Sequence, residues 1–117
     1  MKEKMINFLN DYSLIYIIGY NLVTKDFFDF GDKYKLDNIS LTKTLFVDEE
    51  HVIDLNNSIR DQILPQAWKQ GRVKCIVSKP TEDYILGTFY HEDRPIQESV
   101  RFGKEINEKL IEMFEKQ

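Results

Sequence analysis

The sequence has too few cysteines and histidines for a disulfide-stapled or zinc-bound domain. Cys75 is its single cysteine, so no intramolecular disulfide can form. With His51 and His91 as its two histidines, the chain falls short of the ligand set that a closed zinc site takes. Cys75 shares one face of a predicted strand with Val73 and Val77, so we expect it to be a buried core residue.

Long apolar runs and recognisable catalytic motifs are also missing. No run approaches the ~20 apolar residues of a membrane span, and the first residues lack the apolar core of a signal peptide. We find no glycine-rich phosphate loop, nucleophile elbow, paired-histidine helix or calcium loop. We therefore expect a cytoplasmic protein with no membrane partner and no cofactor. We assign no catalytic, cofactor-binding or metal-binding residue, and we favour a protein that is not an enzyme.

What remains is the composition of one ordinary globular domain, which we expect to span residues 1–117. Hydrophobic residues make up 42% of the chain and charged residues 31%, so disorder and low complexity are excluded. The aromatic content of 13% is the unusual figure. The net charge is −4, yet residues 66–80 carry four basic residues and no acid, so the middle of the chain is locally basic.

Three segments have the periodicity or the terminal signals of helices. Lys2 to Tyr12 places apolar residues on one face. A middle helix begins at Asp48, whose side chain suits an N-cap, and closes before Pro65. A long C-terminal helix begins at Pro95. Its apolar stripe consists of Ile96, Val100, Gly103, Ile106, Leu110 and Met113 or Phe114.

Alternating or continuous apolar residues predict short strands elsewhere. The predicted strands are residues 14–18, 27–30, 33–36, 39–47, 72–78 and 84–90, with the last two forming a hairpin. The fold class is therefore α+β, a mostly antiparallel sheet of about five to six strands packed by about three helices. This order of elements is similar to that of profilin-like and roadblock-like domains. No residue motif accompanies the similarity, so it implies no function.

The basic segment carries one candidate binding site. Its members are Trp68, Lys69, Arg72, Lys74 and Lys79. Lysines and arginines that neutralise phosphates, next to an aromatic ring for base stacking, are typical of proteins that hold single-stranded RNA or DNA. The alternative is a solvent-facing strand whose charges prevent aggregation at the sheet edge, with Trp68 packed in the core.

The aromatic residues carry a second candidate site. Alternation places Tyr84, Leu86 and Tyr90 on the strand face opposite Ile85 and Phe89. A helix, a partner or a second subunit must cover that face, and two-fold self-association is the commonest arrangement of this kind. A protein interface is therefore predicted at Phe27, Tyr84, Leu86 and Tyr90, with a homodimer as the simplest form.

The segment His91-Glu92-Asp93-Arg94 offers a third candidate, a small pocket with His91 as general base or ligand. Adjacent residues of an extended chain point to opposite faces, which opposes convergence of His91 with Glu92. His51 has acids at helical spacing, which is also typical of a solvated helix face.

These observations favour a non-enzymatic cytosolic binding module, an adaptor, inhibitor or immunity-type regulator, that acts through a protein–protein surface. The first alternative is an RNA- or DNA-binding regulator that uses residues 68–79. The second is a small ligand-binding domain or enzyme with a pocket near His91.

Overall fold

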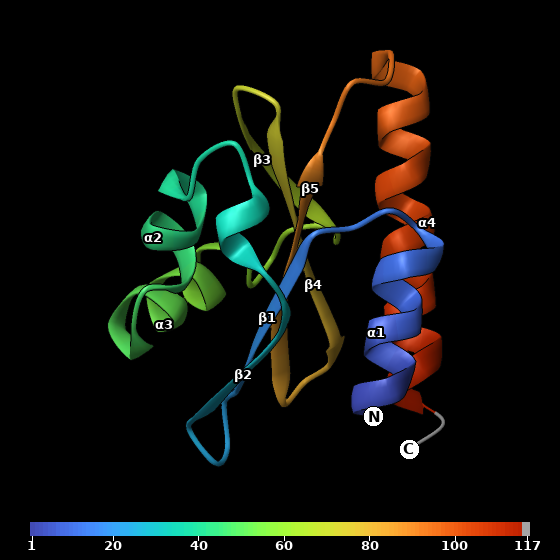
Figure 1. The fold of residues 1–117 in the computed structure, drawn as a ribbon. Helices are drawn as coiled ribbons and strands as arrows, with labels where there is room; N and C mark the ends of the chain where they lie inside the picture. Colours follow the sequence, from blue (N-terminus) through green and yellow to red (C-terminus); the bar gives the residue numbers. More distant parts are fainter. Residues whose placement is uncertain (116–117) are drawn as a thin grey trace.

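The computed structural model describes residues 1–115, in which a five-stranded sheet lies between two layers of helices (Figure 1). In chain order the elements are α1 (Lys2–Asp11), β1 (Tyr16–Asn21), β2 (Asp26–Gly31), the short 3-10 helix η1 (Lys33–Lys35), α2 (Ser40–Phe46), α3 (Glu49–Ser58), β3 (Gln66–Gln70), β4 (Val73–Thr81), β5 (Tyr84–His91) and α4 (Ile96–Glu115). The predicted α+β class is confirmed. Within this range, no helix combines the length and apolarity needed to cross a membrane.

The strands pair in the order β2-β1-β5-β4-β3, and every pairing is antiparallel. The predicted β4–β5 hairpin is confirmed and lies at the centre of the sheet with β1. The two edges are β2 and β3. Alternation along each strand sends neighbouring side chains to opposite faces, so each face needs its own helical cover.

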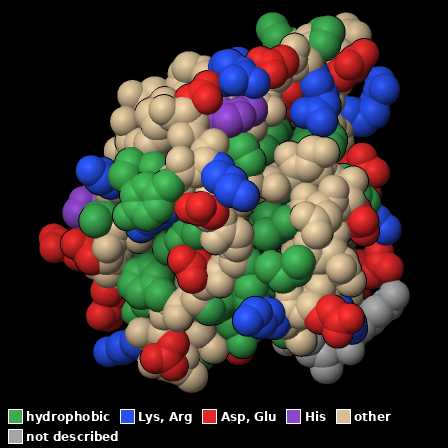
Figure 2. All heavy atoms as spheres, in the orientation of Figure 1, with side chains coloured by type: hydrophobic (Ala, Val, Ile, Leu, Met, Phe, Trp, Pro, Cys, Tyr) green, Lys and Arg blue, Asp and Glu red, His purple; other side chains and the backbone are tan. Residues whose placement is uncertain are grey.

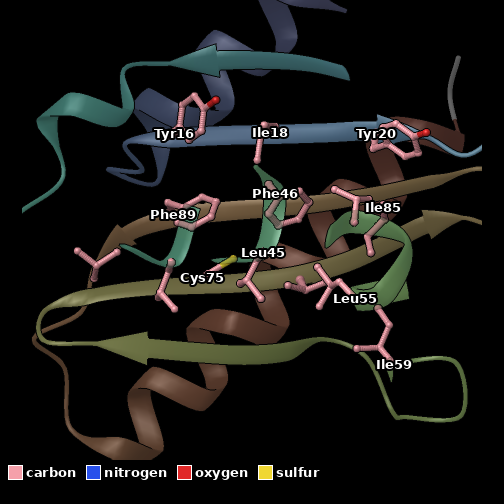
Figure 3. Close-up of a cluster of buried hydrophobic side chains, with 14 of the residues drawn as sticks. Tyr16, Ile18, Tyr20, Leu45, Phe46, Leu55, Ile59, Cys75, Ile85 and Phe89 are labelled. Atoms are coloured by element: carbon pink, nitrogen blue, oxygen red, sulfur yellow. The ribbon is translucent and has the colours of Figure 1, made fainter. Parts of the chain in front are cut away.

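On one face of the sheet, α2 and α3 cover the first core (Figures 1 and 3). Phe46 of α2 and Leu55 of α3 pack there against Tyr16, Ile18 and Phe89 of the central strands. On the other face, α1 and α4 cover a second core. It contains Met5, Phe8, Leu9, Leu14, Ile17, Ile76, Leu86, Tyr90, Ile106, Leu110 and Phe114. Helices therefore bury both faces of the central strands.

The long helix α4 is confirmed, but its stripe is buried only in part. Gly103, Ile106, Leu110 and Phe114 are buried, and a Cβ at Gly103 would stand 3.0 Å from Ile76 Cδ1, so the helix packs very closely on β4. At the start of the helix, Ile96 is 82% exposed and Val100 is 49% exposed. The first turns of α4 therefore extend past the core with apolar side chains uncovered.

Residues 33–47 differ from the sequence prediction. We predicted strands over 33–36 and 39–47, whereas the structure has η1 and α2 there. The Asn38 side chain accepts a hydrogen bond from the Ser40 backbone at 3.2 Å, at the start of α2. Leu41 and Leu45 are four residues apart, a spacing that fits the period of a strand and that of a helix equally well. Packing against the sheet decides in favour of the helix.

The middle of the chain needs two further corrections. Asp48 caps α3 as predicted, because its Oδ1 accepts from the His51 backbone at 2.9 Å, but the helix ends at Ser58, well before Pro65. Residues 66–70 form the edge strand β3, which we did not predict. Ile63, which the predicted helix from Asp48 to Pro65 would include, lies outside α3 and is 88% exposed.

Candidate functional site

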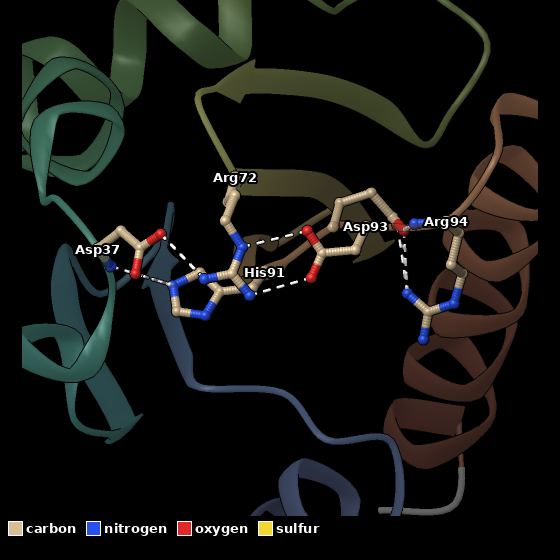
Figure 4. Close-up of polar contacts among 6 residues, drawn as sticks. Asp37, Arg72, His91, Asp93 and Arg94 are labelled. Carbon is tan, nitrogen blue, oxygen red and sulfur yellow. Dashed lines mark hydrogen bonds and ion pairs between the residues drawn. The ribbon is translucent and has the colours of Figure 1, made fainter.

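A polar cluster at one end of the sheet joins segments that are far apart in the sequence (Figure 4). Arg72, in the turn between β3 and β4, donates from Nε and Nη2 to Asp93 at 3.1 and 3.0 Å. Its Nη1 donates to Asp37 Oδ2 at 3.2 Å. Bidentate pairing of this kind fixes the orientation of the guanidinium. The cluster therefore ties the loop before α2 to the loop after β5, and much of the binding capacity of Arg72 is already used.

His91 faces Asp37 and not the acids that follow it in the chain. The Asp37 backbone N–H donates to His91 Nε2 at 3.0 Å. The same nitrogen lies 3.3 Å from Asp37 Oδ1. Glu92 is buried and is hydrogen-bonded by Arg94, in keeping with the alternation of side chains along an extended segment. The partner of His91 is thus a residue 54 positions away, and the expected convergence of His91 with Glu92 does not occur.

Two buried charged groups, Glu92 and Lys74, lie near each other on the α4 side of the same segment. The Glu92 side chain is almost fully buried and accepts from the Arg94 backbone at 2.8 Å and from Arg94 Nη1 at 3.1 Å. The Arg94 guanidinium lies over the Phe102 ring at 3.6 Å from its centroid. The Lys74 amine donates to Ser99 Oγ at 2.6 Å. These contacts attach the start of α4 to the sheet.

Acid is expected to destabilise the protein through Glu92. Burial alone would raise the pKa of this carboxyl, but hydrogen bonds from Arg94 and Ser99 outweigh it and hold the pKa below its ordinary value of 4.5. A carboxyl whose pKa is lower in the folded state stabilises the fold above its unfolded pKa, and this stabilisation is lost as the pH falls through the folded pKa. Urea unfolding as a function of pH should show this loss below pH 4.5.

Glu92→Gln is expected to be less stable at neutral pH and to lose less stability on acidification than the wild type. Glu98→Gln, at an exposed position in the first turn of α4, is the control and should follow the wild-type profile. If Glu92→Gln and the wild type lost stability in parallel, Glu92 would contribute nothing to the acid sensitivity.

The basic segment does not form one patch. Trp68 packs against the core under α2 and α3, whereas Lys69 and Lys74 are register partners on the opposite face. Lys74 is buried beneath α4, so the strand face that we expected to be open to solvent is covered. Lys79 is half-buried in β4, and Arg72 is engaged by two carboxylates. RNA or DNA binding stays an untested prediction that this geometry does not favour.

The aromatic set is also divided. Leu86 and Tyr90 are fully buried, and Tyr90 packs edge-on against Phe102 of α4. Tyr84 is half-buried against Phe114. The prediction that these three residues form an open interface is therefore corrected, because α4 of the same chain covers them. Phe27 stays exposed and remains a proposed contact residue. Figure 2 shows hydrophobic side chains open to solvent on this side of the molecule, over β2 and α2.

A different surface combines an unpaired strand edge with exposed apolar side chains. Strand β3 pairs only with β4 among the strands of residues 1–115, so its outer backbone groups have no strand partner. Ile63 and Val100 line one cavity together with Ala67 of β3. Ile96 lies one helical turn before Val100 on α4. We call β3 together with Ile63, Ile96 and Val100 the β3-edge surface. We did not predict this surface from the sequence, because Ile63 fell within the predicted middle helix and Ile96 within the apolar stripe of the predicted C-terminal helix.

The remaining candidates behave as ordinary structural residues. Cys75 is fully buried and burial raises the pKa of its thiol, which disfavours the reactive thiolate. His51 is exposed at the start of α3, where its Nδ1 lies 2.7 Å from Asp48 Oδ1. His91 contacts Asp37 instead, so the two histidines have different partners. Across the described part of the chain, no three histidine, cysteine or acidic residues are grouped in a way that could hold a metal ion.

Comparison with known proteins identifies a similar fold but no family for this chain. No family model matches the sequence. No curated protein matches it either. Among solved structures, MglB of Myxococcus xanthus is similar in fold, with a TM-score of 0.55 over 95% of this chain and 91% of that chain. The fold is roadblock-like. Sequence identity is 12%, so the likeness concerns the fold alone.

Proposed function

We propose that this protein is a non-enzymatic binding module, a cytoplasmic regulator or adaptor, that works as a homodimer joined at the β3-edge surface. The observation that carries the proposal is the exposure of Ile63, Ile96 and Val100 beside a strand with unpaired backbone groups. Apolar patches next to an open strand edge mark association sites, because pairing satisfies the backbone and buries the apolar groups together.

A second copy fits this surface better than it fits the other edge. Antiparallel pairing of β3 with β3 of another copy, centred on Trp68, places Lys69 opposite Ala67 of the second copy, so the two lysines do not oppose each other. The two-fold axis lets each copy cover the exposed isoleucines of the other. Strand β2 carries Asp26 and Asp29, and like charges at that edge oppose self-pairing.

The similarity in fold to MglB is consistent with a protein-binding regulator. The absence of recognisable catalytic spacing in the sequence points the same way. The binding partner of the dimer would use other surfaces, of which the exposed Phe27 region is our candidate.

The dimer is tested by sedimentation velocity of the wild type and of the double variant Ile63→Asp with Ile96→Asp. Both positions are more than four-fifths exposed in the single chain, so the variant is expected to fold normally and to sediment as a monomer at concentrations where the wild type is dimeric. Val23→Asp introduces the same charge at an exposed apolar residue between β1 and β2 and should leave the dimer intact.

Two results would contradict the proposal. One is a wild type that remains monomeric up to millimolar concentration. The other is dissociation by Val23→Asp as well, since that would indicate a general effect of charge and not a contact at β3.

A further inference from the structure

A small cavity lies between α4 and the β3 side of the sheet, next to the β3-edge surface. Its volume is about 170 Å³. Its walls are mainly apolar and come from Ile63, Leu64, Ala67 and Val100. A volume of this size corresponds to about five or six water molecules, at ~30 Å³ of liquid volume for each. It therefore suits a ligand of a few carbon atoms and not a nucleotide.

The Lys74 side chain lines this cavity and is only 8% exposed. Its amine donates to Ser99 Oγ at 2.6 Å, and Ser99 is the one hydrogen-bond acceptor that the described residues place on this amine. An ammonium group has three donors, and burying them without partners is costly. Burial accordingly lowers the pKa of Lys74. The side chain thus presents unsatisfied donor capacity at a buried position.

The charges around the cavity favour an anion. Lys104 of α4 lines it as a second cation, and the lining residues within the described range include no acid. The nearest buried carboxylate is Glu92, which attracts Lys74 without a direct hydrogen bond and is itself hydrogen-bonded by Arg94 and by Ser99. Lys69, across the register from Lys74, adds further positive charge on this face. A bound carboxylate would find two cations and no repelling lining group.

We propose that this cavity binds a short branched aliphatic carboxylate, with its carboxylate on Lys74 and its alkyl group against the apolar wall formed by Leu64, Ala67 and Val100. A free short-chain acid and the C-terminal residue of a peptide both offer this chemistry. The binding of a free acid does not require the dimer proposed above, and it is measured by a different signal.

The test follows the Lys74 methylene signals of 13C-lysine-labelled protein by NMR during titration with isovalerate. Isovaleramide, which has the same shape without the charge, is the ligand control. A short peptide ending in valine, with and without C-terminal amidation, is the second arm. We expect isovalerate or the free-acid peptide to shift the Lys74 signals, and the amides to bind at least about tenfold more weakly. Which arm binds identifies the source of the carboxylate.

Two variants locate the binding. Lys74→Met should abolish it, as followed by the signals of Lys104, the second lysine that lines the cavity, in the same labelled protein. Val100→Trp should fill the cavity from its exposed side and weaken binding at least about tenfold without removing a buried contact. Val23→Trp, at an exposed apolar residue outside both the cavity lining and the β3-edge surface, is the control and should bind as the wild type does.

The proposal is overturned if neither isovalerate nor the free-acid peptide moves the Lys74 signals at concentrations on the order of 50 mM, well above the Kd of a weak ligand. Equal binding of the amides would also overturn it. So would equal effects of Val100→Trp and Val23→Trp. None of these results depends on the sedimentation of the protein, so failure here is distinguishable from failure of the dimer.

Discussion

A chain that ends at Phe102 is expected to lose its cooperative unfolding transition. The truncation removes Ile106, Leu110 and Phe114, which cover the second core, and exposes Ile17 and Leu86 beneath them. Each large apolar side chain that is buried contributes about 1.5 to 3 kcal/mol, so losing the burial of these five side chains removes about 7.5 to 15 kcal/mol. This loss is comparable with the whole stability of a typical domain, about 5 to 15 kcal/mol. Thermal melting followed by circular dichroism measures the result.

Point variants separate this effect from a general intolerance of truncation. Leu110→Ala is expected to cost about 2 to 5 kcal/mol, because the residue is fully buried and leaves a cavity between α4 and the sheet. Ile96→Ala shortens an exposed side chain of the same helix and should cost less than about 0.5 kcal/mol. Equal costs, or a truncated chain with an unchanged midpoint, would mean that α4 is not part of the core.

Gly87→Ala is expected to destabilise the protein by about 1 to 3 kcal/mol. A methyl group at this position of β5 would overlap the ring of Phe46, which α2 places directly over the strand. Replacing glycine by alanine in a strand otherwise stabilises by about 0.4 to 1 kcal/mol, because it reduces the entropy of the unfolded chain. The steric overlap with Phe46 outweighs this gain in stability only if α2 packs directly on β5. Urea unfolding measures the difference.

A double-mutant cycle shows whether Phe46 is the cause. In the Phe46→Leu background, Gly87→Ala should cost about 1 kcal/mol less, because the smaller side chain leaves room for the methyl group. Gly71→Ala is the matched control. Gly71 has φ +61° and no neighbour near its missing Cβ, so the cost of this variant is backbone strain and should be the same in both backgrounds. Additivity at Gly87 would contradict the placement of α2.

Hydrophobic periodicity predicted the helices and strands correctly where a segment carried one clear pattern over many residues. The long stripe of α4, the amphipathic α1 and the alternating strands β4 and β5 were predicted close to their observed limits. It failed where the segment was short. Leu41 and Leu45 fit a strand and a helix equally, and nothing local in β3 distinguishes its five residues from a loop. Pairing with β4 makes them a strand.

The candidate sites show the same division. Alternation correctly placed Lys74 and Tyr90 on the strand faces opposite Cys75 and Phe89. It could not tell which face met solvent, so it assigned one residue to a basic patch and the other to an interface. Both are buried, because α4 packs on that face. The side chains that remain uncovered, Ile63 and Ile96, had looked like core residues.

The sequence by itself determined the α+β class, the antiparallel β4–β5 hairpin and the caps and stripes of the long elements, because these depend on residues that are close along the chain. The tertiary structure alone decided which faces are covered. The strand order, the edge position of β3, the burial of Lys74 beside a cavity and the meeting of Arg72 with Asp37 depend on contacts between distant segments. Such contacts form when whole elements pack, so no local pattern records them.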